Sequence, residues 1–267
     1  DVGVPYVGVT LLYRGGYFAQ RLAPDGVQTS GAHPWNPEEM LRPMSPRVVV
    51  PLDGREVVLR AWRLDIHGVR DHIVPVYYLD SDLPENDEAD RGLTDRLYAG
   101  GPDHRIRQEV ILGIGGRRML RAIGHDVGIH HMNEGHASFV CIELLSEYLS
   151  RERELTGKIV HLDAAAVAAV RQKCVFTTHT PVEAGHDRFA IDQVRAIVGE
   201  HPLFERPDLY GEDGVLNTTR LAMNFSKFSN AVARRHGEIS REMFPGYPIR
   251  SITNGIHAST WASEPMR

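Results

Sequence analysis

The sequence predicts an α/β domain that combines a parallel sheet with an antiparallel, hairpin-rich insertion. Three observations support this class. Residues 1–100 are rich in short β-branched runs separated by turn residues, whereas residues 104–256 alternate between helical patterns and short strands. Three of those strands end in loops that set His or Asn beside Gly or Pro. Because helix and strand alternate, we expect parallel strands with right-handed crossovers, and residues 1–267 in one domain.

Four apolar runs predict strands in the first part, at 4–12, 48–52, 57–64 and 73–79. The second and third runs flank Asp53-Gly54, a strong short-range hairpin signal. Apolar residues at alternate positions of the third run predict one buried face. Pro75 has no amide hydrogen, so we expect the fourth run to lie at an edge of its sheet.

The second part predicts helices and strands in alternation. Helices are expected at 105–123, after Asn133, at 162–170 and through Leu221, Phe225, Phe228 and Val232; strands are expected at 127–132, 174–177 and 249–253. Asn133 is expected to cap the second helix. The glycines at 113, 115 and 116 disfavour the first helix by about 1 kcal/mol each, unless they allow close helix packing.

The three polar loops span residues 131–136, 178–187 and 253–257. Each follows an apolar run, which is the composition of a loop carried on the end of a buried strand. In open α/β sheets, ligands bind at the carboxyl ends of the strands. The repetition therefore predicts one pocket built from several loops.

Composition excludes several classes of function. The chain has 267 residues, 42% of them hydrophobic, and a net charge of −5 without a basic cluster, so we expect no nucleic-acid partner. No apolar run is long enough to cross a bilayer. Cys141 and Cys174 lie in apolar segments and predict buried thiols in a reducing, cytoplasmic setting. Since the chain opens at Asp1 and closes soon after the third loop, we expect it to be a piece of a longer protein.

A metal site is not expected, although His131 and His136 flank Glu134. The zinc-protease pattern places two His at i and i+4 on one helix, whereas these two are five residues apart across a helix start. Polar side chains such as Asn133, Glu134 and His136 instead suit the recognition of sugar hydroxyl groups.

Nucleophilic catalysis is not expected either, because no Gly-x-Ser-x-Gly elbow exists and neither cysteine has a polar, activating neighbour. For other polar residues structural interpretations stay open. His179 could bond its own loop backbone, His186 could contact Asp187, and Arg105 could lie on a solvated helix face rather than bind an anion.

Six segments of the chain share one resemblance, namely 8–18, 79–86, 105–109, 131–136, 176–187 and 253–257 with Trp261. In this order they closely resemble the α-glucan phosphorylases, in the shorter bacterial and archaeal branch of the glycogen, starch and maltodextrin phosphorylase family. The resemblance covers essentially the whole chain. Several independent motifs in one order make it specific.

The resemblance implies the N-terminal half of a glycosyltransferase-B-type fold, in which two Rossmann-like domains face each other across a cleft. It implies retaining transfer of a glucosyl unit from the non-reducing end of an α-1,4-glucan or maltodextrin to orthophosphate, giving glucose 1-phosphate. The cofactor would be pyridoxal 5′-phosphate, bound to a lysine of the C-terminal domain and therefore to no residue of this chain. Full-length members form homodimers, so we expect one here.

The resemblance also implies roles for single residues. His179 resembles the catalytic histidine that contacts the transferred glucose and, through its backbone carbonyl, the developing positive charge. Asn254 resembles the asparagine that holds a hydroxyl of the same sugar. Glu134 and His136 lie where the family lines the glucan channel, next to Asn133.

A gate to the catalytic site is implied at residues 98–103, beginning at Tyr98 and followed by the basic residue Arg105. This segment is short and lacks the asparagine of the larger animal enzymes. The family's pyridoxal lysine and phosphate-binding residues belong to the second domain, and its Gly-rich loop would precede Asp1. We therefore expect this piece to be inactive alone. Two alternatives stay open, a nucleotide-sugar glycosyltransferase of the same architecture and a non-catalytic carbohydrate-binding remnant.

Overall fold

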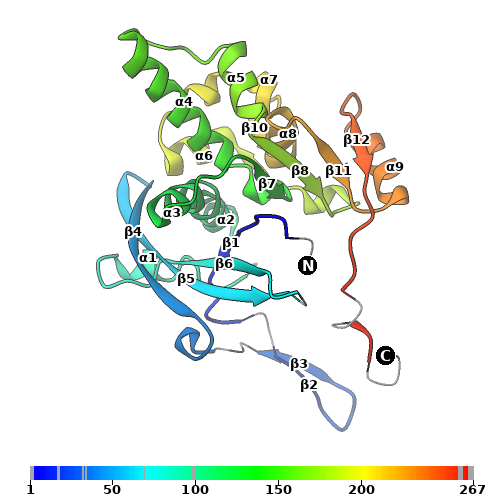
Figure 1. Ribbon diagram of the computed structural model, residues 1–267. Coiled ribbons are helices and arrows are strands. Elements are labelled where there is room, and N and C mark those ends of the chain that lie inside the picture. The colour runs from blue at the N-terminus through cyan, green and yellow to red at the C-terminus, as the bar shows by residue number, and fades with distance from the viewer. Residues whose placement is uncertain are drawn as a thin grey trace.

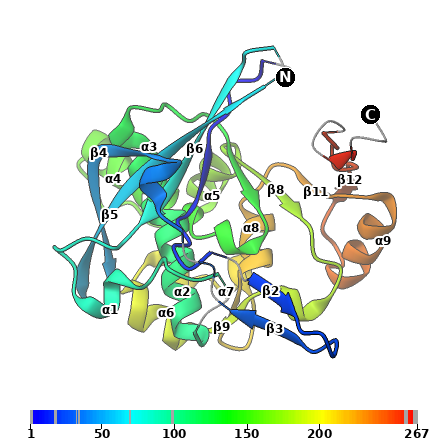
Figure 2. The same cartoon turned by 90° about the horizontal axis from the view of Figure 1, so that it is seen from below.

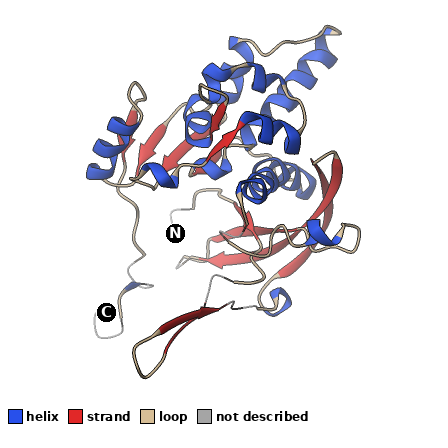
Figure 3. Ribbon diagram, turned by 180° about the vertical axis from the view of Figure 1, so that it is seen from behind, coloured by secondary structure: helices blue, strands red, loops and turns tan. Residues whose placement is uncertain are grey.

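The computed structural model describes residues 3–16, 19–31, 33, 35–68, 70–97, 100–257 and 261–263. Two four-stranded sheets lie on either side of a long helical segment (Figures 1 and 3). The expected α/β class, with a parallel sheet and antiparallel hairpins, is confirmed. Within the described ranges, no helix has the length and apolar character needed to span a membrane.

The first sheet has the strand order β1-β6-β5-β4. Its strands are β1 (Gly8–Leu11), β4 (Arg42–Leu52), β5 (Arg55–His67) and β6 (Ile73–Asp80). The predicted hairpin is confirmed. Leu52 pairs with Arg55, and the two turn residues Asp53 and Gly54 have φ of 51° and 72°, as a type I′ turn requires.

The expectation that Pro75 marks an edge strand is wrong for the strand as a whole. β6 lies between β1, which runs parallel to it, and β5, which runs antiparallel. The pairing with β1 begins at Val76, one residue after Pro75. On that side Pro75 faces no paired residue, so its missing amide hydrogen interrupts no bond of the β1–β6 ladder.

Two shorter features accompany this sheet. β2 (Ala19–Leu22) and β3 (Gln28–Gly31) form a hairpin that projects from the body of the molecule (Figure 2). The first sheet is also flanked by a 3₁₀ turn at Pro37–Glu39 and by the short helix α1 (Glu88–Arg91).

The predicted first helix is confirmed as one continuous helical segment with a π-helical turn inside it. It consists of α2 (Pro102–Val110), the π turn Ile111–Gly115 and α3 (Gly116–Ile123). Its glycines do allow close packing. A Cβ at Gly113 would lie 2.5 Å from the backbone nitrogen of Val140, and a Cβ at Gly115 would lie 2.5 Å from the side chain of Leu59.

The second sheet is parallel, with the strand order β12-β11-β8-β7. Its strands are β7 (His130–Asn133), β8 (Cys174–Thr178), β11 (Ser229–Ala231) and β12 (Ile249–Ser251). The connecting helices are α4 (Val140–Thr156), α5 (Ala164–Arg171), α6 (Ile191–Val198), α7 (Pro207–Tyr210), α8 (Thr218–Asn224) and α9 (Arg234–Met243). The small hairpin of β9 (Arg188–Ala190) and β10 (Val215–Asn217) and 3₁₀ turns at Gly135–Ala137, Glu183–Gly185 and Pro202–Glu205 complete this part.

Two predicted elements are wrong. Asn133 does not cap a helix, because it ends β7 opposite Thr177 and α4 begins only at Val140. The predicted helix through Leu221 and Val232 is a helix, a turn and a strand. Its apolar residues recur at helical spacing, but α8 ends at Asn224 and the chain then enters the sheet as β11, which pairs with strands on both sides.

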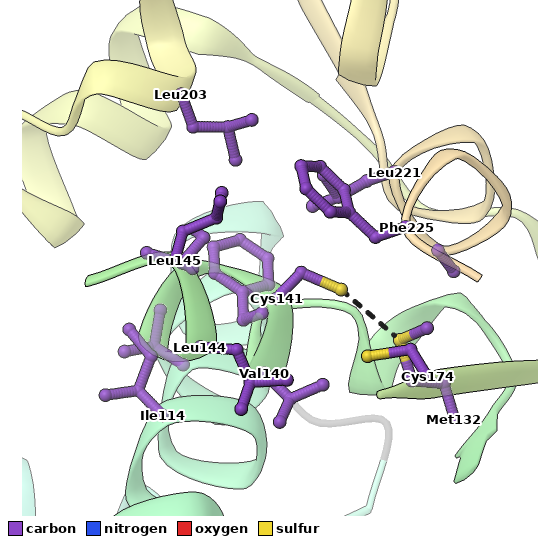
Figure 4. Packing of buried hydrophobic residues seen from close by; sticks show 14 of the residues in the cluster. Ile114, Met132, Val140, Cys141, Leu144, Leu145, Cys174, Leu203, Leu221 and Phe225 are labelled. Atoms are coloured by element: carbon purple, nitrogen blue, oxygen red, sulfur yellow. Dashed lines mark hydrogen bonds between the residues drawn. The ribbon is translucent and has the colours of Figure 1, made fainter. Parts of the chain in front are cut away.

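One hydrophobic core joins both sheets to the helices between them. Cys141 and Cys174 are buried free thiols, as predicted, and burial raises the pKa of Cys141 well above its usual range. The Cys141 sulfur lies 3.6 Å from that of Met132, in a region where Leu221 of α8 and Phe225, the residue after that helix, also pack (Figure 4). This rigid core fixes the carboxyl ends of the parallel strands.

Candidate functional site

The three polar loops leave the same edge of the parallel sheet, as the sequence predicts. Residues 134–139 follow β7, residues 179–187 follow β8, and residues 252–257 follow β12 (Figure 1). Asn254 is held at this edge by its backbone N–H, which donates to the carbonyl of Val232 at 3.1 Å. Its strand is separated from β7 by β8 and β11, so Asn254 and Glu134 lie toward opposite ends of the edge.

Glu134 connects the first two loops. Its backbone has φ 72° and ψ 166°, a region that side-chain-bearing residues rarely occupy. Its N–H donates to the carbonyl of Thr177 at 2.9 Å, and its carboxylate Oε1 accepts a hydrogen bond from the backbone N–H of His179. The strained residue therefore sets the path of the loop that carries His179.

Gly135 fits closely against the start of α8. A Cβ at this position would lie 2.5 Å from the hydroxyl of Thr218 and 2.9 Å from that of Thr219. Any side chain here would push the β7 loop away from α8. The loop that contains Glu134 is therefore fixed on both sides, by Thr177 of β8 and by α8.

A row of polar side chains crosses the sheet just below the edge. The Nε2 atom of His131 lies 2.8 Å from the hydroxyl of Thr177, which donates in turn to Oδ1 of Asn230 at 3.0 Å. Burial and the nearby His179 lower the pKa of His131, which favours its neutral ring. This row joins β7, β8 and β11. The sequence pattern gave no signal for Asn230.

Arg105 is engaged by two carboxyl groups. Its Nη2 lies 3.0 Å from Asp187, the last residue of the β8 loop, and its Nε lies 3.2 Å from Glu109 on the same helix. Asp187 thus pairs with Arg105. The ring of His186, the residue before Asp187, lies 2.9 Å from the hydroxyl of Thr219. Both residues therefore have a partner outside their own loop. Sequence reasoning missed Glu109, although its i,i+4 spacing from Arg105 is a detectable ion-pair signal.

His136 lies among these charges and is half-buried. Burial lowers its pKa first, and the positive charge of Arg105 lowers it further; Glu134, Asp187 and His179 also act on it electrostatically. A ring kept neutral can both donate and accept a hydrogen bond, which suits a hydroxyl group. The structure therefore gathers Arg105, Glu134, His136 and His179 at one end of the edge.

The remaining predicted residues are less closely associated. Asn133 is exposed at the end of β7, and Tyr98 lies outside the described residues. A cavity of about 90 Å³ beside the β8 loop is lined by His186, Arg188, Asn217 and Arg220, with Glu183, Met243 and Phe244. The residues expected to bind sugar do not line it.

These polar loops lie at the carboxyl edge of a parallel sheet, which is where open α/β proteins bind their ligands. Over 98% of its length the chain is 35% identical to maltodextrin phosphorylase of Thermococcus litoralis and 37% identical to glycogen phosphorylase of Mycobacterium tuberculosis. It is 29% identical to glycogen phosphorylase of Aquifex aeolicus over its whole length. This chain spans only part of the length of these relatives: 32% of the first, 33% of the second and 40% of the third. No family model matches the chain.

The resemblance found in the sequence is thereby confirmed. This chain is homologous to a segment of the glycogen and maltodextrin phosphorylases.

Proposed function

We propose that this chain forms the glucan-binding side of the catalytic cleft of an α-glucan phosphorylase. The reaction would be retaining transfer of a glucosyl unit from an α-1,4-glucan or maltodextrin to orthophosphate, giving glucose 1-phosphate. The observation that carries the proposal is the bond from the strained residue Glu134 to the backbone of His179. Backbone strain of this kind persists where the surrounding structure over-determines it, and it clusters at functional sites.

Each residue has a role that its surroundings support. His179 is half-buried and would present its ring to the transferred glucose, while Glu134 fixes its backbone. His136, neutral at pH 7, would bond a hydroxyl group of the glucan. Asn254 would bond a hydroxyl of the transferred sugar from the other end of the edge.

Three further residues were assigned to substrate binding from the sequence. Arg105 would act through the loop that it holds, because Asp187 and Glu109 already occupy its guanidinium group. Asn133 would extend the sugar-binding edge from the end of β7. Tyr98, at the start of the proposed gate, belongs to the residues that the structure does not describe.

The cofactor of the proposed reaction is pyridoxal 5′-phosphate, which requires a lysine as its Schiff-base partner. The lysines of this chain do not fit that task. Lys173 and Lys227 precede β8 and β11 and so lie at the opposite edge of the sheet from His179, and Lys158 follows α4. We therefore assign the cofactor to residues outside this chain and derive no step through it.

The proposed partners are an α-1,4-glucan, orthophosphate and a second subunit in a homodimer. A nucleotide-sugar glycosyltransferase is not favoured, because the similar proteins with a stated activity are phosphorylases. The same relatives argue against a purely carbohydrate-binding remnant.

The test is an assay of a protein that joins this chain to the remaining segments of its relatives. Maltodextrin with orthophosphate should release glucose 1-phosphate, and this chain alone should not. His179→Ala should lower turnover by orders of magnitude at unchanged thermal stability, whereas His161→Ala, a change at an exposed histidine before α5, should leave it unchanged. Turnover with a nucleotide sugar in place of phosphorolysis would contradict the proposal.

A further inference from the structure

A buried carboxyl group, Glu109, lies beneath the ion pair that joins α2 to the β8 loop. Glu109 is 1% exposed and follows Arg105 by one helical turn. Arg105 contacts Glu109 at 3.2 Å and Asp187 at 3.0 Å, so one guanidinium group serves two carboxyl groups. Neither Glu109 oxygen has a donor in hydrogen-bonding geometry. The arrangement therefore contains one more acidic group than its single positive charge compensates.

Two ionised carboxylates in this place would leave an uncompensated, buried negative charge, which is unfavourable. Burial and the neighbouring Asp187 raise the pKa of Glu109 well above its usual range, although Arg105 acts in the opposite direction. A proton on Glu109 removes the excess charge. It also turns an acceptor into a donor beside Asp187, whose carboxylate contacts the same Arg105 guanidinium group.

Among the residues that the structure describes, the groups that face this cluster from other elements supply no second positive charge at neutral pH. His136, from the turn after β7, interacts with both Arg105 and Asp187, and its lowered pKa keeps it neutral. Tyr13, which follows β1, interacts with Arg105 and is uncharged below its pKa. The helix α6, which packs along α2, contributes Gln193, which donates to Asp103 at 3.2 Å near the start of α2.

We propose that Glu109 is a positioning residue that, in its protonated form, donates a hydrogen bond to Asp187 and fixes the loop that carries His179. The proton stays on Glu109 while the Arg105–Asp187 ion pair is intact. When alkaline solution removes it to solvent, Glu109 and Asp187 repel each other and the last residues of the loop separate from α2. The structural part of the proposal stands by itself, whereas its effect on turnover rests on the function proposed above.

The structural part is tested by hydrogen exchange of the chain between pH 5 and 10, with each rate divided by its intrinsic rate at that pH. Protection of residues 180–188 should fall as the pH rises, while protection of α4 stays constant. In Glu109→Gln this loop should keep its protection at every pH, because an amide donates to Asp187 and does not titrate. Glu109→Leu should lose it at every pH, with α4 again reporting that the chain is folded.

Glu143→Gln is the matched control. Glu143 is also a buried glutamate paired with an arginine, Arg118 at 2.8 Å, but it lies on α4 away from the loop. This variant should keep the wild-type pH dependence of the loop. Loop protection that is independent of pH in the wild type, or equally pH-dependent in Glu109→Gln, would overturn the proposal.

Turnover gives a second readout that a merely structural role would not produce. The assay uses a protein that completes the site. In the wild type kcat should fall at alkaline pH, whereas in Glu109→Gln it should stay level. At pH values below this fall, KM should be the same in both proteins. If the loop responds as expected but no phosphorolysis occurs, the proposed function fails and the role of Glu109 stands. If phosphorolysis occurs but kcat of Glu109→Gln falls at alkaline pH as it does in the wild type, the proposed function stands and the role of Glu109 fails.

Discussion

The carboxylate of Glu134 accepts a hydrogen bond from the backbone N–H of His179, across the gap between two neighbouring parallel strands. Glu134 does so from a backbone conformation that glycine alone adopts freely. A residue with a side chain is thus kept where glycine would be more stable. The bond to His179 is the compensation that the structure offers, because a backbone N–H left without a partner in this loop would be unfavourable.

Substitutions at Glu134 should separate these two effects. Glu134→Ala keeps the backbone strain and loses the bond, so it should be the least stable variant. Glu134→Gly also loses the bond but relieves about 1–3 kcal/mol of strain, part of which is offset by the flexibility of glycine in the unfolded chain. Glu134→Gln keeps a neutral acceptor and should lie nearest the wild type. Urea denaturation measures the order, and an alanine variant more stable than the glycine variant would contradict it.

Asp80 is a second buried carboxylate, and its partners compensate it fully. It is 0% exposed and accepts hydrogen bonds from Arg14 at 2.7 Å, Arg60 at 2.7 Å and the Trp62 indole at 2.8 Å. These donors hold its pKa below the usual value, although burial is the largest single influence and acts to raise it.

Asp80→Asn should therefore destabilise the first sheet by about 3–5 kcal/mol, because two arginines lose their carboxylate in a poorly solvated place. Thermal or urea unfolding measures the loss. Asp126→Asn, at an exposed position before β7, provides the control and should change stability by less than about 0.5 kcal/mol. A small effect at Asp80 would show that water replaces the carboxylate.

The sequence was sufficient to predict those elements whose local signals agree with the fold. Asp53-Gly54 specified its hairpin because a type I′ turn needs positive φ at both central residues. The three polar loops were found because the apolar runs of β7, β8 and β12 are interrupted by His, Asn and Gly at the same edge. The family motifs singled out both His179 and Glu134, and the structure joins them by a hydrogen bond.

Elements defined by long-range contacts were not predictable. β11 has the sequence Ser-Asn-Ala, which has no strand propensity, and it is a strand because β8 and β12 pair with it on both sides. The strained conformation of Glu134 ended β7 seven residues before α4, so Asn133 was wrongly expected to cap that helix. The i,i+4 spacing of Arg105 and Glu109 is visible in the sequence, but the second carboxyl group on Arg105, that of Asp187, lies 78 residues beyond Glu109 and is brought there only by the fold.

Gly113 should be the least replaceable glycine of the helical segment. A Cβ there would lie 2.5 Å from the Val140 nitrogen and 2.6 Å from the Phe139 carbonyl carbon, both backbone atoms that cannot rotate away. Gly113→Ala should cost about 1–3 kcal/mol through overpacking, even though alanine favours helix. Gly128→Ala, where the added Cβ meets nothing within 4 Å, is the control and should not destabilise the chain. Equal stability of both variants, measured by chemical denaturation, would contradict the packing explanation.

His130 should make the protein sensitive to mild acid. It is 8% exposed at the start of β7, and burial, helped by the positive charge of Arg117, lowers its pKa to about 4. Between pH 6.5 and 4 the unfolded chain therefore binds a proton that the folded chain excludes, so stability falls as the pH drops through this window. The loss from this residue is on the order of 3 kcal/mol.

His130→Leu should remove that part of the acid slope and leave stability near pH 8 equal or higher, because neither ring nitrogen has a hydrogen-bond partner in good geometry to lose. Unfolding free energies at several pH values between 4 and 8 measure the slope. Part of the slope should remain in this variant, since burial also lowers the pKa of His201 to about 4. His161→Leu changes an exposed histidine and should keep the full wild-type slope. An unchanged slope in His130→Leu would mean that the ring takes up its proton over the same pH range in the folded and the unfolded chain, which its low exposure beside Arg117 argues against.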